Sequence, residues 1–551
     1  MNEVQIIIPM SGIGKRFIDA GYSEPKPLIE VDGIPIIEHV VNMFPGESNF
    51  TFICNSNHLT TTNMRAILER IAPAAKIIEI EPHKKGPVYA VTQIFNLLND
   101  EEEVIVNYCD FSVFWNYADF LNHTRNRKAD GAIPAYKGFH PHMLGSTNYA
   151  FMRDEEQWML EIKEKEPFTN NRMEEYASVG TYYFRCGSYV KKYFQALLDE
   201  DVNLNGEYYV SLVYNLLNRD GLRTSIYNVQ HMLQWGTPQD VQEYKAWSNY
   251  FRNIIESNEE DKTVPHSTLL MPLAGAGSRF VKEGYEDPKP LIEVSGKPMI
   301  IQASQSLPKT GKQVFLCQKS HLDAYPLEEE LKMVYPDATI VTVESLTEGQ
   351  ACTCELGLKY IDSEDSLLIG ACDNGMIWNQ DGFQTLIKDP NVDVVVFSFR
   401  HHVSSERYPQ MYGWIDIEED QTIKHVHVKS PISDDPYNDH AVVGSFYFKN
   451  VKIFKESLDQ LYTKNIRINN EFYVDSLINE AIDLGYNAKV FELDQYVGWG
   501  TPNDLRTYEY WQSFFHKWEW HPYTLDQEVT LDKDALPGLE IKYTTFKQEN
   551  E

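Results

Sequence analysis

The sequence has no uninterrupted apolar run of the roughly 18 residues that suggest a transmembrane helix, so insertion into a membrane is not expected. Its N-terminus leads directly into the apolar segment 5–9, without the basic and apolar regions of a signal peptide. Cysteines are few: there are 7, an odd number, and they are scattered. This argues against a disulfide framework or a zinc site, and we expect a cytoplasmic protein with reduced thiols.

Positive charge is also scarce. The chain has 49 Lys and Arg against 81 Asp and Glu, a formal net charge of −32. Nucleic acids and anionic membranes attract positive surfaces, so neither is an expected partner. If the substrates are phosphates, a few local cations and a bound metal must overcome the overall negative field.

A long internal repeat is present. Residues 9–37 align without gaps with residues 272–300, an offset of 263 (272 minus 9), and 17 of these 29 positions are identical. The offset becomes 264 further along, where Trp-Gly-Thr-Pro recurs at 235–238 and 499–502. Matching motifs that keep the same order, with a single one-residue change in offset, predict duplication of a whole domain.

The repeat predicts the domain organisation. We expect domain 1 over residues 1–256, a polar linker over 257–265, domain 2 over 266–518 and a C-terminal extension over 519–551. Each domain is long enough to bury its own core.

Apolar runs in domain 1 alternate between the patterns of strands and helices. The expected strands are 4–9, 50–54, 76–80 and 104–108, and the expected helices are 36–44, 62–71 and 88–98. Helices are also expected over 208–218 and 472–484, ended by Gly221 and Gly485. Such alternation predicts a mainly parallel sheet with helices on both faces and a ligand site beyond the carboxyl ends of its strands.

Two short motifs follow the first strand of each copy. Gly12-Ile13-Gly14-Lys15-Arg16 becomes Gly275-Ala276-Gly277-Ser278-Arg279 in the second copy. Glycines let backbone N–H groups approach phosphate oxygens, and arginine offers a fork of donors. About ten residues later, Pro25-Lys26-Pro27 and Pro288-Lys289-Pro290 place a lysine between two prolines, which restrict its backbone.

Together these motifs resemble the signature of the sugar-phosphate nucleotidyltransferases, also called sugar-1-phosphate pyrophosphorylases. The resemblance extends over both copies. It implies two tandem Rossmann-like (GT-A-like) domains, each a mainly parallel mixed sheet flanked by helices. It also implies transfer of a nucleotide from an NTP to a sugar phosphate, plausibly for capsule or other cell-surface polysaccharide synthesis.

The resemblance also implies roles for individual residues. The glycine loop, with Gly12, Gly14, Gly275 and Gly277, would hold the triphosphate, and Gly86 and Gly349 would lie near the base. The catalytic cations would be Arg16, Lys26, Arg279 and Lys289, and Mg²⁺ would be held by Asp110 and Asp373. The sugar phosphate would meet Lys165, Gly180, Glu207, Lys429, Gly444 and Glu471.

One position departs from the family pattern. Many members carry a second metal-binding aspartate where this chain has Gln234 and Gly498. Asp240 and Asp504 lie nearby, but we expect them to be N-caps of the following helices. Either the metal has a single protein carboxylate, as is normal for Mg²⁺, or another acid substitutes.

Two other functions compete with this one. The chain could be a glycosyltransferase of the related fold, although Asp110 and Asp373 are each a single carboxylate where such enzymes usually have a pair. Alternatively, one copy could be catalytic and the other regulatory. The nucleotide base, the sugar or other phosphate ester, and the oligomeric state are not readable, and a homo-oligomer is compatible with the sequence.

Overall fold

The computed structural model describes residues 4–145, 148–256, 263–275 and 277–544. These residues form two compact units: unit 1 consists of residues up to 248 with 518–521, and unit 2 consists of residues 249–517 with those from 522 on. Across these described ranges, no helix is long and apolar enough to cross a membrane.

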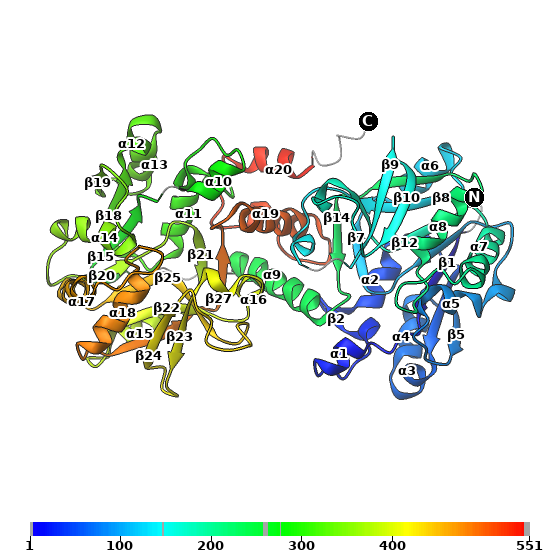
Figure 1. Cartoon of the computed structure of the whole chain (residues 1–551), viewed down its shortest axis with the longest axis horizontal. Helices are drawn as coiled ribbons and strands as arrows, with labels where there is room; N and C mark the ends of the chain where they lie inside the picture. The colour runs from blue at the N-terminus through cyan, green and yellow to red at the C-terminus, as the bar shows by residue number, and fades with distance from the viewer. Residues whose placement is uncertain (1–3, 146–147, 257–262, 276, 545–551) are drawn as a thin grey trace. The chain divides into compact units, whose positions relative to one another are not determined.

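The main sheet of unit 1, blue to cyan in Figure 1, joins a parallel half to a mostly antiparallel half. The parallel strands are β1 (Gln5–Met10), β4 (Phe50–Asn55), β5 (Lys76–Ile80) and β6 (Val104–Asn107). The other strands are β8 (Gly131–Tyr136), β9 (Ala150–Glu155), β10 (Trp158–Glu164), β11 (Tyr176–Ser178), β12 (Thr181–Phe184) and β13 (Thr224–Asn228). The order across the sheet is β11-β9-β10-β13-β8-β12-β6-β1-β4-β5, which confirms a mixed α/β sheet.

The helices of unit 1 follow the expected alternation with strands. They are α1 (Lys15–Asp19), α2 (Ile36–Asn42), α3 (Ser56–Thr61), α4 (Met64–Ile71), α5 (Gly86–Thr92), α6 (Tyr117–Asn126), α7 (Gly187–Asp199) and α8 (Val210–Arg219). The helix expected over 88–98 was wrong in its second half, because α5 ends at Thr92 and a 3₁₀ turn covers Phe95–Leu97. Gly221, at φ 81°, follows α8 as predicted.

Unit 2 repeats the strand order of unit 1. Its sheet runs β19-β18-β15-β20-β25-β22-β26, as β5-β4-β1-β6-β12-β8-β13 does in unit 1, with β23 and β24 at the side. The strands are β15 (Val264–Leu273), β18 (Thr310–Gln318), β19 (Thr339–Val343), β20 (Ser366–Ile369), β22 (Val394–Phe399), β23 (Gly413–Ile417), β24 (Ile423–Val428), β25 (His440–Phe448) and β26 (Ala488–Glu492).

The helices of unit 2 cover both faces of this sheet, with an apolar cluster on each side. They are α10 (Ser278–Lys282), α11 (Met299–Ser306), α12 (Lys319–Ala324), α13 (Leu327–Val334), α14 (Gln350–Gly357), α15 (Gln380–Lys388), α16 (Val403–Arg407), α17 (Val451–Lys464), α18 (Val474–Asp483), α19 (Pro502–Lys517) and α20 (Leu536–Thr544). Gly485, at φ 90°, follows α18 as Gly221 follows α8.

The units do not divide where the polar segment predicts. Residues 257–262 of the predicted linker lie outside the described residues, and β15 already begins at Val264. The division falls at 248/249, inside α9 (Pro238–Glu256), because Phe251 packs against Tyr508, Phe515 and Tyr523 of unit 2. Most of the predicted extension also belongs to unit 2, where the fully buried hydroxyl of Tyr523 donates to Glu528.

A two-stranded sheet in each unit brings distant segments together. In unit 1, β7 (Phe111–Phe114) pairs with β14 (His231–Gln234), and in unit 2, β21 (Asn374–Ile377) pairs with β27 (Gln495–Gly498). The first strand of each pair directly follows the predicted metal aspartate, and the second directly precedes Trp-Gly-Thr-Pro. The two motifs therefore lie side by side, although more than 120 residues separate Asp110 from Trp235. Short hairpins near the glycine loops complete the strands: β2 (Glu30–Val31) with β3 (Ile34–Pro35), and β16 (Glu293–Val294) with β17 (Lys297–Pro298).

Candidate active site

The glycine loop of each unit connects the first strand to a short helix. Gly14 and Gly277 adopt left-handed conformations, with φ of 70° and 58°, just before α1 and α10. This conformation favours glycine. A Cβ built on Gly12 or Gly275 would meet no atom within 4 Å, so open space lies above the loop. The loop therefore offers backbone next to a space that a phosphate group could occupy.

The proline-flanked lysine of each unit contacts the predicted metal aspartate. Lys26 Nζ lies 2.7 Å from Asp110 Oδ2, and Lys289 Nζ lies 2.5 Å from Asp373 Oδ2. Burial, the largest single cause, disfavours the ammonium form of Lys26, but the charge and hydrogen bond of Asp110 together with Cys109 outweigh it, so the pKa of Lys26 lies above its ordinary value. The pKa of Lys289 is raised in the same way, with burial opposed by the charge and hydrogen bond of Asp373 together with Cys372. Each site thus presents a fixed cation beside a carboxylate.

The arginine of each glycine loop lies close enough to influence the pKa of its neighbours. The positive charge of Arg16 partly offsets the rise in the pKa of Lys26 and the rise in the pKa of Tyr209. Arg279 acts in the same way on Lys289 and on Asp504. The structure therefore brings the predicted arginine, lysine and aspartate of each unit into one neighbourhood.

The Trp-Gly-Thr-Pro segments brace the aspartates. The backbone N–H of Trp235 donates to the carbonyl of Asp110 at 2.8 Å, and Trp499 donates to Asp373 at 2.7 Å. A Cβ on the following glycine, Gly236, would lie 3.3 Å from Asp110 Oδ2. Glycine at this position leaves room for the carboxylate, which explains why the motif recurs.

Asp240 and Asp504 cap helices, but not as predicted. Thr237 is the N-cap of α9: its side chain accepts from the N–H of Asp240, and Asp240 Oδ2 accepts from the N–H of Thr237 at 2.9 Å. Thr501 and Asp504 form the same reciprocal pair. The prediction of these aspartates as N-caps was wrong by three positions, because the threonine takes that place in a capping box.

The acid content of the sites limits how they could hold a metal. Burial raises the pKa of Asp240 to about 6, and Gln234 Nε2 donates to its Oδ2 at 3.0 Å. No group of three His, Cys, Asp or Glu side chains in the described part of the chain is arranged to hold a metal ion. A metal at Asp110 would therefore need phosphate or water among its ligands, which is common for Mg²⁺.

The predicted acceptor lysines have an unusual backbone. Lys165 and Lys429 adopt left-handed conformations with φ of 60° and 57°, which is unfavourable for a residue with a side chain. The N–H of Lys165 donates to the carbonyl of Tyr149 at 2.8 Å, and that of Lys429 donates to Tyr412 at 3.0 Å. Two strained lysines at matching positions suggest a functional constraint.

A tyrosine links each acceptor lysine to the predicted glutamate. Lys165 Nζ donates to the hydroxyl of Tyr209 at 2.7 Å, and that hydroxyl donates to Glu207. Lys429 Nζ donates to Tyr473 at 2.8 Å, and Tyr473 bonds to Glu471. The two tyrosines were missed from the sequence, although both stand two residues after the glutamate.

The predicted base-side glycines are places of close backbone contact. Gly86 has φ 83°, and a Cβ there would lie 2.7 Å from the backbone N and O of Tyr208. Gly349, at φ 131°, meets the backbone of Phe472 in the same way. The N-terminus of α5 or α14 is thus held against the loop that carries Glu207 or Glu471.

Replacing Gly86 by alanine is expected to destabilise unit 1 by roughly 2–3 kcal/mol, because the side chain adds both an unfavourable φ and a backbone clash. Urea unfolding measures the loss. Gly21→Ala is the matched control, since Gly21 has φ 83° with no atom within 4 Å of a built Cβ. Equal losses for the two variants would show that close packing at Gly86 contributes nothing.

The remaining predicted glycines lie beside the aspartate strands. Gly180, at φ 105°, accepts from the N–H of Tyr108 at 3.1 Å, and a Cβ there would lie 2.9 Å from the Phe111 ring. Gly444 has φ 92°, and a Cβ built there would lie 3.4 Å from the Cβ of Ala371. Close packing and a positive φ account for the absence of a side chain at Gly180, and the positive φ alone accounts for it at Gly444. Direct contact with sugar stays a prediction.

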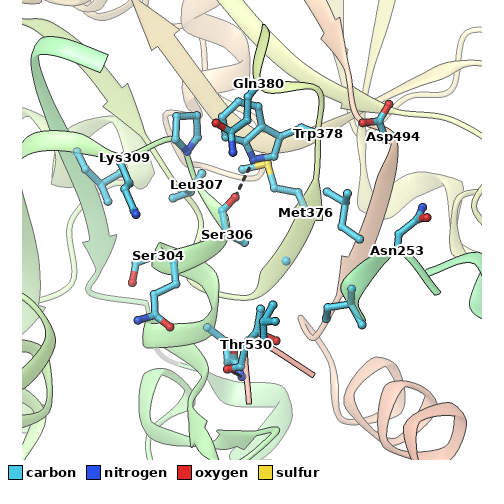
Figure 2. Close-up of a pocket in the computed structure, with 18 of the residues that line it drawn as sticks. Asn253, Ser304, Ser306, Leu307, Lys309, Met376, Trp378, Gln380, Asp494 and Thr530 are labelled. Atoms are coloured by element: carbon cyan, nitrogen blue, oxygen red, sulfur yellow. Dashed lines mark hydrogen bonds between the residues drawn. The ribbon is translucent and has the colours of Figure 1, made fainter. Parts of the chain in front are cut away.

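A cavity of about 1120 Å³ opens in unit 2, away from these side chains (Figure 2). Met376 and Trp378 line it, and Trp378 Nε1 donates to the carbonyl of Ser306 at 2.9 Å. Among the described residues that line it, none is a predicted phosphate-binding or metal-binding residue. The candidate active site is therefore the strand-end surface around Lys289 and Asp373, not this cavity.

Comparisons with known proteins each cover less than half of the chain. Residues 6–170 match the family model of the MobA-like NTP transferase domain. A nucleoside-diphosphate-sugar pyrophosphorylase from Vibrio cholerae RC9 aligns at 21% identity and a TM-score of 0.37, covering 44% of this chain and 99% of its own. An inositol-1-phosphate CTP transferase from T. maritima aligns at 16% identity and a TM-score of 0.37, covering 45% and 96%. No curated protein matches.

Proposed function

We propose that the chain is a sugar-phosphate nucleotidyltransferase, a proposal supported by the match of residues 6–170 to the family model of the MobA-like NTP transferase domain. It would convert an NTP and a sugar phosphate, or a similar phosphate ester, into an NDP-sugar and pyrophosphate. The observation that carries the proposal is that one unit holds both the Lys26–Asp110 pair and the Lys165–Tyr209–Glu207 chain, and that the charge of Arg16 acts on both Lys26 and Tyr209. One set suits a triphosphate, and the other suits an acceptor that carries both a phosphate and hydroxyl groups.

The reaction needs no protein nucleophile. A phosphate oxygen of the acceptor attacks the α-phosphorus of the NTP, the bond to the β-phosphate oxygen breaks, and pyrophosphate leaves with that electron pair. Lys26 and Arg16 would bind the triphosphate and offset the charge that develops on the leaving group. Lys165 would hold the acceptor phosphate in line.

Mg²⁺ is the metal that this chemistry implies. The single carboxylate of Asp110 fits an ion that completes its coordination with phosphate oxygens and water. When bound, the ion would neutralise charge on the phosphates.

The second unit would be a second active site of the same class. It has Arg279, Lys289, Asp373, Lys429 and Glu471 where the first has Arg16, Lys26, Asp110, Lys165 and Glu207. The Lys–Asp and Lys–Tyr distances agree between the units to within 0.2 Å. This agreement favours two working sites over one site with a regulatory copy. A role in cell-surface polysaccharide synthesis is part of the proposal.

The test is a screen of the four NTPs against a panel of sugar phosphates, polyol phosphates and phosphocholine, with pyrophosphate release as the signal. Turnover with one or two pairs is expected. Sugar transfer from a finished NDP-sugar, without pyrophosphate release in the screen, would favour a glycosyltransferase and overturn the proposal.

A further inference from the structure

The cavity of unit 2 lies at positions where unit 1 has buried aromatic rings. Under the offset of 263, three residues that line the cavity correspond to three buried aromatic residues of unit 1: Leu307 to Phe44, Gln313 to Phe50 and Gln380 to Tyr117. The strand register confirms the second pair, because Phe50 lies opposite Ile6 and Gln313 lies opposite Leu269. Unit 2 therefore has one aliphatic side chain and two amides where unit 1 has three rings.

A tryptophan beside these positions is the same in both units. Trp115 Nε1 donates to the carbonyl of Met43 at 3.1 Å, and Trp378 Nε1 donates to the carbonyl of Ser306 at 2.9 Å. The serine also stands at the position of the methionine under the same offset. This hydrogen bond fixes the orientation of the indole in each unit.

The surroundings of the two indoles differ. The Trp115 ring centroid lies 6.0 Å from that of Phe44 and 5.7 Å from that of Tyr117. Among the described residues, Trp378 has a ring contact only with Phe383, at 5.6 Å, and its indole lines the cavity. Unit 2 therefore presents an oriented indole to a space that the corresponding rings of unit 1 would occupy.

Polar groups that have no protein partner line the same cavity. Gln313 Nε2 donates to the carbonyl of Thr310 at 3.0 Å, which leaves Gln313 Oε1 without a donor among the described residues. The side chains of Asn253 and Asp494 have no hydrogen bond or ion pair within the described part of the chain. Both lie to the right of Trp378 in Figure 2. The wall thus offers a ligand both donors and acceptors.

The charges of the wall disfavour a phosphorylated ligand. The described lining has three acids, Glu256, Asp381 and Asp494, against two lysines, and no arginine. One of the lysines, Lys297, already donates to Gln305 Oε1 at 3.1 Å. Phosphate sites are typically built from arginine forks or lysine charges, and here acids outnumber the cations. The expected ligand is therefore neutral.

We propose that the cavity of unit 2 binds a neutral carbohydrate. A sugar ring packs its C–H face against an indole, and its hydroxyls both donate and accept hydrogen bonds, as the amides of the wall do. The volume of about 1120 Å³ lies slightly above the usual range of small-molecule sites, roughly 300–1,000 Å³, so there is room for more than one ring. The inference does not depend on the proposed function, since no residue it uses is assigned to the reaction.

The first test asks whether the full chain binds sugars. Glucose, N-acetylglucosamine, maltose and sucrose are titrated calorimetrically, and adenosine is the probe for a nucleoside. At least one of the four sugars is expected to bind with a Kd of about 1 mM or tighter. No binding by any of the four at concentrations roughly tenfold higher, or binding of adenosine alone, overturns the proposal.

The second test locates the bound sugar. Trp378→Ala removes the indole and is expected to weaken binding by roughly tenfold or more, the scale of losing a tryptophan anchor. Trp115→Ala is the matched control, because it removes the corresponding indole and its hydrogen bond from unit 1. The control is expected to leave the Kd within about twofold of the wild type. Equal losses in the two variants overturn the assignment to this cavity.

A third variant fills the cavity instead of removing its wall. Leu307→Phe, Gln313→Phe and Gln380→Tyr together give unit 2 the three rings of unit 1, and urea unfolding checks that the chain is folded. Sugar binding is expected to weaken by roughly tenfold or more, because the rings take the space of the ligand. A sugar bound only at the phosphate-binding surfaces would not be displaced. An unchanged Kd in this triple variant therefore overturns the proposal.

Discussion

Asp110→Asn is expected to lower turnover at unit 1 by roughly 10²–10³-fold, the scale of removing one electrostatic contact from an active site. The amide keeps the shape of the side chain but loses its charge. It can neither balance the Lys26 ammonium, 2.7 Å away, nor serve as the anionic ligand that Mg²⁺ prefers. Asp373→Asn is expected to have the same effect on unit 2.

The two variants also test whether the units work separately. Each single variant should keep the reaction of the intact unit, and the double variant should lose both. Pyrophosphate release with saturating NTP and acceptor measures this, and thermal unfolding checks that each variant is folded. Full activity at a unit that lacks its aspartate would contradict the assignment of that site.

The predicted site residues that the structure brings together in each unit share a common property. Arg16, Lys26 and Asp110 recur at a fixed offset as Arg279, Lys289 and Asp373, so the repeat itself separated them from ordinary turn residues. The structure also shows the backbone conformation of Lys26. This residue begins a 3₁₀ turn, Lys26–Leu28, directly after Pro25. The prolines therefore fix the backbone as the sequence suggested.

Other features have no distinct signature in the sequence. The helix expected over 88–98 was too long because a 3₁₀ turn repeats apolar residues at nearly the same spacing as an α-helix. The left-handed backbone of Lys165 could not be foreseen, since lysine shows no preference for it. Tyr209 and Tyr473 looked like core residues, as most tyrosines in such segments are. Their recurrence two residues after a glutamate was the one available signal.

The polar composition misplaced one boundary. The polar run 257–262 led us to expect domain 1 to end at residue 256 and a linker over 257–265. Residues 249–256 instead pack with unit 2, because Phe251 fits an aromatic cluster with Tyr508 and Tyr523. Local composition shows only where the chain is polar. The boundary between two units depends instead on which unit the buried aromatic side chains pack with.

Lys165→Gly is expected to weaken acceptor binding while relieving backbone strain, and Lys165→Ala separates the two effects. Both variants lose the ammonium, so kcat/KM for the acceptor should fall roughly 10–100-fold, as expected for a hydrogen bond to a charged group. The φ of 60° at Lys165 is unfavourable for residues that carry a Cβ and is readily adopted by glycine. Lys165→Gly should therefore be more stable than Lys165→Ala by roughly 0.5–1 kcal/mol, after allowing for the greater freedom of glycine in the unfolded chain.

Urea unfolding and steady-state kinetics on the two variants, and on Lys429→Gly with Lys429→Ala in unit 2, test this. Equal stability of the glycine and alanine variants would show that the lysine backbone is unstrained. Retained acceptor kinetics would remove the lysine from the site. The expected combination, lower activity with higher stability in the glycine variant, would show that the fold holds the lysine in an unfavourable backbone to place its ammonium. Such a cost is characteristic of residues kept for function rather than for folding.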